Sequence, residues 1–464
     1  MTSGPLRAIV GMDLRFHFTR PMFWILLVTL GLVAFGLSSG GLMISSGDSS
    51  IGGESKAWVT SEFANGMMFP VVAFLLYSFF IAVAAGMAIP RDDELKVGPV
   101  LHATRLAPGE YVWGKFGAVL LLFLGVMAAH LLLTILFNQV IPSANAEQVR
   151  GPFRLLNYLR PAVVLALPFV IFLCGTSFAI GERTRKPILV FVTPVALFMV
   201  SIFFLWGWSP SWLDPAWNRL LMWIEPSGFR WINETWLKVD MGVDYYNQQP
   251  ISYDGPFLLS RLVYALLGLG MVATSKRHFT ATVRGRQSVG KARWWKRKKK
   301  EPANMTEWAD VTATSLRRPL ASLKMTSSVP GFVRATWDVA RFEARNLRVQ
   351  PGLYIFVPLI LLQTIGSSFF QLGAFDTQLL LTPGVAAVGS MNTLTMLVAF
   401  LILFYTVESL IREWRTELAP IYYSTPARTA ALLAGKALAN AIVGVAILLA
   451  CYLEIGRASC RERV

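Results

Sequence analysis

The sequence is poor in charged residues, which excludes most soluble folds. Of its 464 residues, 15% are charged and 54% are hydrophobic, whereas soluble domains carry about 25% charged residues. The hydrophobic residues form long unbroken runs, and a helix needs about 20 such residues to cross a bilayer. The runs lack the alternation typical of membrane barrels. They therefore predict an all-α integral membrane protein.

Cysteines and catalytic motifs are also scarce. The 3 cysteines form no disulfide framework, metal-binding spacing or redox pair. The segment from Gly109 to Lys115 has the spacing of a phosphate-binding loop, but Phe116 stands where that loop needs Ser or Thr. We therefore expect no catalytic residues, no metal and no cofactor in this chain. It is predicted not to be an enzyme, and any nucleotide hydrolysis is expected on a separate protein.

The apolar runs predict a polytopic bundle of about nine transmembrane helices. The predicted spans are 22–44, 66–89, 114–137, 161–181, 188–208, 257–275, 351–372, 389–411 and 435–453. With a cytoplasmic N-terminus, the inside segments up to residue 300 hold 21 Lys and Arg residues and the outside segments hold 7. Because cytoplasmic loops carry the excess of Lys and Arg, the N-terminus is predicted to be cytoplasmic.

Composition along the chain divides it into five segments. These are an amphipathic interface helix (1–20), a first six-helix membrane unit (21–275), a basic cytoplasmic linker (276–330), a second membrane unit (331–453) and a tail (454–464). The net charge is +16, and basic residues crowd the linker. Next to a membrane, such a run favours anionic lipids at 276–300 over nucleic acid.

The outer loop 209–256 of the first unit is rich in tryptophan. The pair Asp214-Pro215 predicts a helix start, because an acidic cap is followed by proline at the first turn. Trp217, Leu220, Leu221 and Ile224 would share one face of that helix. We expect a short helix in the outer membrane interface, with an ordinary loop bearing interfacial aromatics as the alternative.

The two membrane units share a sequence pattern. Asp13-x-Arg15 opens the first and Glu343-x-Arg345 opens the second, 330 residues later. The loop after the second span of each unit also matches, and its spacing from threonine to Gly-Lys is identical. Its parts are Arg91 to Leu95, Thr104 and Gly114-Lys115 in one unit, and Arg415 to Leu418, Thr425 and Gly435-Lys436 in the other. We interpret these matches as two tandem copies of one unit.

This pattern of an acidic loop after the second span resembles ABC-2 type transporter permeases, the membrane subunits of ABC exporters. The resemblance implies an ABC ATPase subunit as partner and a bacterial inner-membrane location. It also implies that the loop after each second span forms a helix that couples to the ATPase. The coupling residues implied are Arg91, Asp92, Asp93, Glu94, Arg105, Pro108, Arg412, Glu413, Arg415, Glu417, Pro426 and Arg428. The transported substrate cannot be inferred.

A narrower resemblance gives an alternative function. The segment Asn233 to Asn247, together with the tandem units, is similar to bacterial proteins that fuse an ABC-2 membrane region to an M1-type zinc aminopeptidase. In those proteins the peptidase follows the membrane region, and this chain contains no His-Glu-x-x-His. The chain would then be the membrane anchor of such a fusion. A membrane scaffold that transports nothing is a third possibility.

Two further features complete the sequence predictions. His130 and Glu408 are ionisable groups inside predicted spans and are therefore functional candidates, although a hydrogen-bonded packing role for His130 and an intrahelical pair of Glu408 with Arg412 are simpler alternatives. Residues 454–464 interrupt an apolar run and resemble a translated sequencing adapter. We expect them to be an artefact, with the second unit truncated and the natural protein longer.

Overall fold

The computed structural model divides the chain into two compact units, Met1–Gly290 and Lys291–Val464, which are described separately. The residues that the structure describes are 4–39, 42–46, 49–52, 58–95, 97, 106–141, 150–185, 187–206, 213–239, 241–283, 331–348, 353–354, 357–358, 360–361, 364, 383–415 and 428–461.

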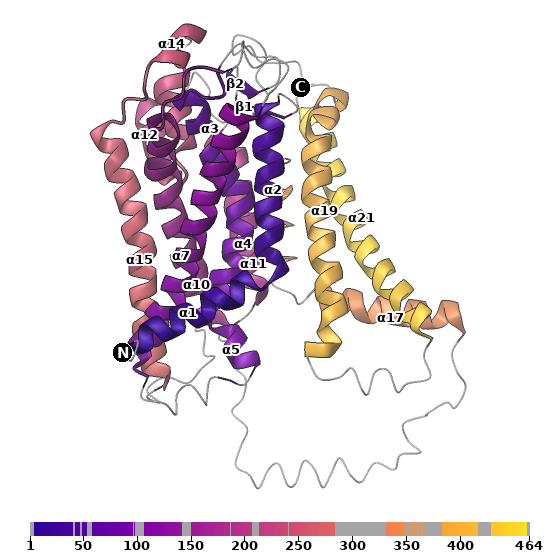
Figure 1. Ribbon diagram of the computed structural model, residues 1–464. Helices are drawn as coiled ribbons and strands as arrows, with labels where there is room; N and C mark the ends of the chain where they lie inside the picture. Colours follow the sequence, from indigo (N-terminus) through magenta and orange to yellow (C-terminus); the bar gives the residue numbers. More distant parts are fainter. Residues whose placement is uncertain are drawn as a thin grey trace. The chain divides into compact units, whose positions relative to one another are not determined.

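Unit 1 is a bundle of long helices with α1 (Pro5–Phe18) packed across its N-terminal end (Figure 1). Its remaining elements are α2 (Pro21–Ser38), β1 (Met43–Ser46), β2 (Ser49–Gly52), α3 (Glu62–Val72), η1 (Ala73–Tyr77), α4 (Ser78–Gly86), α5 (Pro90–Glu94), α7 (Pro108–Ile135), η2 (Leu136–Val140), α9 (Leu156–Pro161), η3 (Ala162–Ala166), α10 (Leu167–Thr184), α11 (Pro187–Val200), η4 (Ser201–Trp206), α12 (Pro215–Ile224), α13 (Phe229–Ile232), η5 (Asn233–Leu237), α14 (Val243–Gln248) and α15 (Gly255–Val283).

Several of these elements join into continuous membrane-length helices. Segments η1 to η5 are π-helical, and η1 and η3 follow prolines, Pro70 and Pro161, that lie inside the preceding helix. A proline removes one backbone donor and widens the turn locally. The helix axis therefore continues through each span instead of ending at the proline.

Among the described residues, six helices are long and apolar enough to cross a membrane: Pro21–Ser38, Glu62–Gly86, Pro108–Val140, Leu156–Thr184, Gly255–Val283 and Thr429–Leu453. They match six of the predicted spans. The predicted span 188–208 corresponds to α11 and η4, which contain the shorter apolar stretch Leu189–Phe198. The predicted span 389–411 lies within α19, and most of 351–372 lies outside the described residues.

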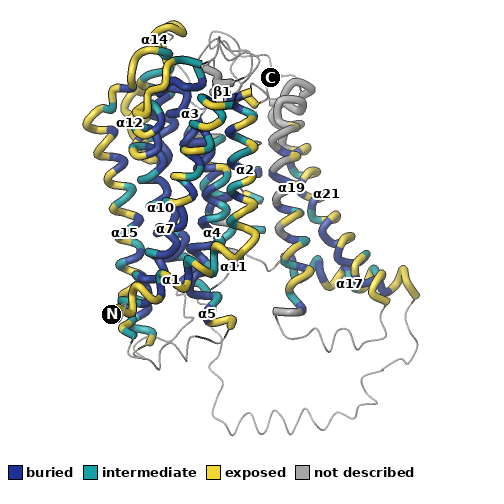
Figure 2. The backbone as a smooth tube through the Cα atoms, viewed as in Figure 1, coloured by how far each residue is buried: buried dark blue, intermediate teal, exposed yellow. Residues whose placement is uncertain are grey.

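The core of unit 1 is centred on α10, which contacts α4, α7, α11 and α15. Buried residues concentrate on these inner helices, whereas α15 has a long exposed face (Figure 2). Two glycine pairs allow very close approach, because a Cβ on Gly175 would meet the Gly268 carbonyl and one on Gly181 would meet the Gly86 carbonyl. The exposed large hydrophobic residues of α15 are leucines and valines, as expected for a surface that faces lipid.

Unit 2 contains three described helices: α17 (Phe332–Leu347), α19 (Pro383–Arg415) and α21 (Thr429–Arg461). The surface helix α17 packs against α21, which also packs against α19. Gly435 permits this contact, since a Cβ there would lie 2.6 Å from Val339 Cβ and 2.8 Å from the Thr336 carbonyl oxygen.

Local predictions in unit 1 can be compared with the structure directly. The predicted interface helix in the outer loop forms as α12, and Asp214 accepts a hydrogen bond from the Ala216 amide at 2.7 Å. Its residues Trp217, Leu220 and Ile224 are exposed. The first span is shorter than predicted, because α2 ends at Ser38 and residues Met43–Ser46 pair with Ser49–Gly52 in an antiparallel hairpin.

Candidate functional site: two buried charge clusters

A buried charge cluster joins three elements at the α1 end of unit 1. Lys115 of α7 places its Nζ 2.9 Å from Asp13 Oδ1 of α1 and 2.8 Å from Asp92 Oδ2 of α5. Arg91 of α5 also contacts Asp13, at 3.3 Å, and Tyr111 of α7 donates a hydrogen bond to Asp92 at 2.8 Å. We call these five residues cluster 1. It fixes the surface helix, the loop helix and the start of a span to one another.

Burial sets the electrostatics of cluster 1. The Lys115 side chain is 1% exposed and that of Asp13 is 2% exposed. Burial raises the pKa of Asp13, and the nearby charges of Lys115 and Arg91 oppose that rise. On the next turn of α1, burial and the charge of Arg91 lower the pKa of His17 to about 4. The protonation of both Asp13 and His17 therefore depends on how α1 packs against the neighbouring helices.

A second cluster joins the three helices of unit 2. Lys436 of α21 lies 2.6 Å from Glu413 of α19 and 3.4 Å from Glu343 of α17. Arg412 of α19 lies 2.5 Å from Glu343. We call these four residues cluster 2. Like cluster 1, it contains a lysine between two carboxylates, with an arginine beside one of the acids.

The two clusters have the same order along the chain, and their arginine, following acid and lysine have the same spacing. Arg412, Glu413 and Lys436 follow Arg91, Asp92 and Lys115 by 321 residues each, and Glu343 follows Asp13 by 330. The glycine before each lysine repeats the correspondence. Gly114 lies against Ile9 of α1, and Gly435 lies against Val339 of α17, again 330 residues after Ile9.

The predicted coupling residues have different positions. Arg91, Asp92, Arg412 and Glu413 belong to the clusters, and Asp93 forms an ion pair with Arg185. Glu94 and Arg428 are exposed, and Pro108 is the first residue of α7. The structure of Arg105, Glu417 and Pro426 lies outside the described residues, as does the side chain of Arg415.

Sequence reasoning did not assign a role to Asp13, Lys115, Glu343 or Lys436, although it used all four as markers of the repeat. Their charge inside or next to an apolar helix was a usable signal, since buried cations require partners. The partner could not be read from the sequence, because Asp13 and Lys115 are separated by 102 residues.

The two intramembrane candidates lie on different helices, His130 on α7 and Glu408 on α19. His130 is fully buried on α7, where Tyr77 contacts its Nδ1 at 2.8 Å and Phe69 packs edge-on against the ring. This arrangement matches the packing role. Glu408 is half-buried on α19.

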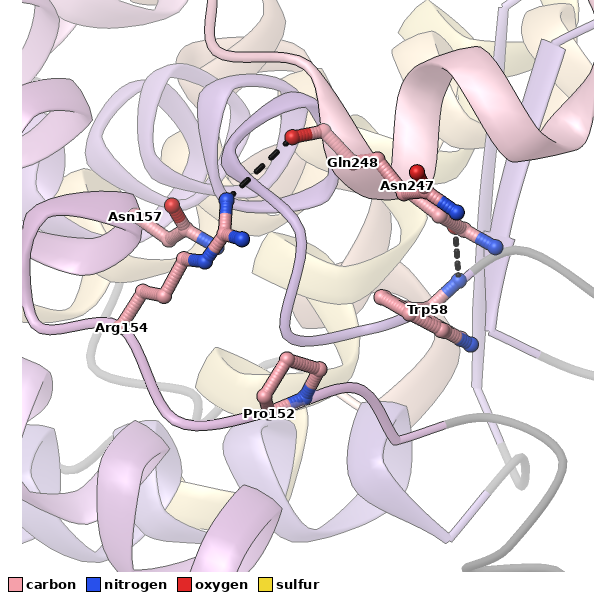
Figure 3. A pocket seen from close by; sticks show the side chains of 6 residues that line it. All are labelled: Trp58, Pro152, Arg154, Asn157, Asn247 and Gln248. Atoms are coloured by element: carbon pink, nitrogen blue, oxygen red, sulfur yellow. Dashed lines mark hydrogen bonds between the residues drawn. The ribbon is translucent and has the colours of Figure 1, made fainter.

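A small polar pocket of about 170 Å³ is lined by residues that include Asn247 and Gln248 of α14 (Figure 3). The helix α14 lies at the opposite end of unit 1 from α1 (Figure 1). Asn247 accepts a hydrogen bond from the Trp58 amide at 2.7 Å, and Arg154 donates one to the Gln248 carbonyl at 3.3 Å. Asn157 donates to the Thr60 carbonyl at 3.1 Å. These bonds hold α14 and the chain around residue 154 to the bundle, so the polar side chains have a structural role.

A buried arginine organises the turn between α12 and α13 at the same end. Arg261 of α15 is 2% exposed and donates hydrogen bonds to the Pro226 carbonyl at 2.6 Å and the Glu225 carbonyl at 3.0 Å. The Glu225 carboxylate accepts from the Gly228 amide at 2.6 Å. Gly228 has a φ of 87°, a conformation that favours glycine.

No protein-family model, curated protein or solved structure matches this chain. Within the described part of the chain, no group of three or more His, Cys, Asp or Glu residues is arranged to hold a metal ion. The two clusters, which contain two carboxylates each and are neutralised by lysine and arginine, are therefore the most organised charged sites that the structure describes.

Proposed function

We propose that this protein is the membrane-spanning permease subunit of an ABC-type exporter, built from two tandem ABC-2-like units and driven by a separate ATPase. The observation that carries the proposal is the recurrence of one charge cluster in both units. In each unit the cluster ties a surface helix to residues at or just after the end of an apolar helix and to the first turns of the next one. These are the parts through which a partner on the membrane surface would act.

The physical role of such clusters favours mechanical coupling over catalysis. Buried ion pairs add little net stability, but breaking one by removing a single partner is costly. They therefore hold elements in a defined geometry. A push on α5 would be transmitted to α1 and α7 as one body, since Asp92 and Arg91 connect α5 to both helices.

The spacing of the clusters supports the tandem arrangement and refines its register. In the sequence comparison Arg91 was matched with Arg415, which left the distance to the shared threonine three residues shorter in the second unit. Matching Arg91 with Arg412 removes that difference, because Thr104 and Thr425 are then also separated by 321 residues. Arg412 and Glu413 thus become the counterparts of Arg91 and Asp92.

Two features support an ATPase on a separate chain and a cytoplasmic position for the coupling segments. The phosphate-loop-like sequence Gly109 to Lys115 lies within the helix α7, where Lys115 is engaged in cluster 1. A phosphate cradle needs a loop with free backbone amides. The excess of Lys and Arg on the N-terminal side supports a cytoplasmic position for α1 and α5.

The proposal is tested by isolating the tagged protein from its native membrane with a mild detergent. We expect co-isolation of a protein that carries a nucleotide-binding sequence, hydrolyses ATP and cross-links to residues 90–97 and 412–418. Reversing Glu94 and Glu417 to lysine should abolish the association, whereas reversing Asp244, an exposed acid of the outer loop, should leave it intact. ATPase association that persists in the Glu94→Lys, Glu417→Lys variant would remove the coupling assignment.

A further inference from the structure

Arg185 has an unusual backbone conformation at the end of α10. Its φ is 51° and its ψ is 22°, and among the described residues it is the only non-glycine residue with positive φ. This left-handed conformation is common for glycine and disfavoured for a residue with a long side chain. An arginine persists there when interactions of its side chain compensate for the strain.

The side chain of Arg185 makes such interactions. Its guanidinium forms an ion pair with Asp93 of α5, and its Nε donates a hydrogen bond to the Glu182 carbonyl at 2.8 Å. Because Asp93 follows Asp92 of cluster 1 directly, α5 is held from two sides. Asp92 fastens it to α7, and Asp93 fastens it to α10.

The last turn of α10 is itself firmly anchored. Glu182 pairs with His278 of α15 at 2.8 Å, and Arg183 donates a hydrogen bond to Thr274 of α15 at 2.7 Å. Gly181 packs directly on the backbone of Gly86, the last residue of α4. The joint between α4 and α5, residues 87–89, therefore lies between two contacts with α10.

We infer that Arg185 is a positioning residue that tethers the coupling helix α5 to α10 and, through Glu182 and His278, to α15. This inference rests on the proposed function, because α5 is a coupling helix only if an ATPase docks there. The ion pair with Arg185 connects α5 to α10 and α15, which contribute no residue to cluster 1. Movement of this one short helix is thereby shared among α1, α7, α10 and α15.

The backbone conformation makes the role testable with one substitution. Arg185→Gly removes the ion pair but relieves the left-handed strain. If Arg185 merely forms the turn, this variant keeps α5 in place and unfolds no more readily than the wild type. If Arg185 is the tether, α5 is released although the turn itself becomes more favourable.

The measurement is hydrogen exchange of the full chain in lipid nanodiscs, followed by mass spectrometry of peptides that cover residues 88–97. We expect Arg185→Gly to accelerate exchange in these peptides about three- to fivefold, as for the loss of one partly exposed ion pair, while peptides from α17 stay unchanged. Arg277→Ala, which removes an exposed arginine of α15, is the matched control and should leave exchange at 88–97 within twofold. Exchange at 88–97 that stays within twofold in Arg185→Gly overturns the inference.

Exchanging the two charges gives a second test. If Arg185 only formed the turn, the exchange of charges would not restore the protection of α5. The single variants Arg185→Asp and Asp93→Arg should each release α5, and the double variant should restore its protection. Failure of the double variant to restore protection when both single variants release α5 also contradicts the tether. These readouts need no ATPase, so the absence of a co-isolated ATPase would reject the proposed function while leaving the tether to be judged by exchange alone.

Discussion

Replacing Lys115 with methionine tests what cluster 1 contributes to the position of α1. Lys115 is 1% exposed and is the cation within 3 Å of both Asp13 and Asp92. Methionine is similar in length but uncharged, so the variant leaves two buried carboxylates with Arg91 as their neighbouring cation. Breaking a buried ion pair in this way costs about 3–5 kcal/mol.

The cost should appear locally, as easier opening of α1 and α5. Since about 1.4 kcal/mol corresponds to a tenfold change in an equilibrium constant, exchange of amides in α1 should accelerate by about a hundredfold to a few thousandfold. Hydrogen exchange in nanodiscs measures this directly. The matched variant Lys436→Met should accelerate exchange in α17 and leave α1 unchanged, because cluster 2 lies in the other unit.

A triple variant separates charge imbalance from lost packing. In Asp13→Asn, Asp92→Asn, Lys115→Met the cluster is neutral apart from Arg91, which stacks on Phe16 at 4.0 Å. Because no uncompensated carboxylate stays buried, most of the loss in Lys115→Met should be recovered. Protection of α1 that is unaffected by Lys115→Met would refute the reasoning about cluster 1.

Three further predictions concern other parts of the two units. His17 has a pKa of about 4 in the folded state against an ordinary value of 6.5. Between these two pH values the unfolded chain binds one more proton than the folded chain, so the stability of unit 1 falls as the pH is lowered through this window. His17→Gln should flatten this part of the stability profile, which is measured by detergent unfolding. Gly435→Ala should loosen α17 at a cost of about 1–3 kcal/mol, because its Cβ would meet the Thr336 carbonyl oxygen at 2.8 Å. Gly114→Ala should cost less, because its Cβ would meet side-chain atoms of Ile9 at 3.0 and 3.2 Å and no backbone atom among its nearest neighbours. Exchange in α17 and α1 compares the two variants, and equal effects would contradict the packing argument. Arg261→Met should cost about 1–3 kcal/mol for each of the two carbonyls it leaves unpaired, which is measured as faster proteolysis between α12 and α13 than in Arg261→Lys.

The sequence predicted the helical bundle well because lipid imposes a simple rule. A span must satisfy its own backbone and be apolar for about 20 residues, so six runs could be found from composition. The hairpin of Met43–Ser46 with Ser49–Gly52 was missed, because only Met43 and Ile44 continue the apolar run and the serine-rich residues after them have no hydropathy pattern that indicates a strand. The π-helical segments were missed because they too have no separate hydropathy signal.

The candidate site was partly predictable. The repeat located the segments that matter, and it included Asp13, Lys115, Glu343 and Lys436 as matching positions. It could not show that each lysine lies between two carboxylates, because that contact depends on how α1 and α17 pack against their neighbours. Arg185 was predicted as an inside charge, and its left-handed conformation and pairing with Asp93 became visible only with the backbone in place.

The central claim is that a separate ATPase drives this chain through its coupling segments. The most direct measurement is the ATP hydrolysis recovered with the tagged protein from native membranes, in the wild type and in the Glu94→Lys, Glu417→Lys variant. The account predicts a co-isolated ATPase that cross-links to residues 90–97 in the wild type and is lost in the variant. Wild-type protein that brings down no ATP-hydrolysing partner under conditions that keep both units folded would contradict it.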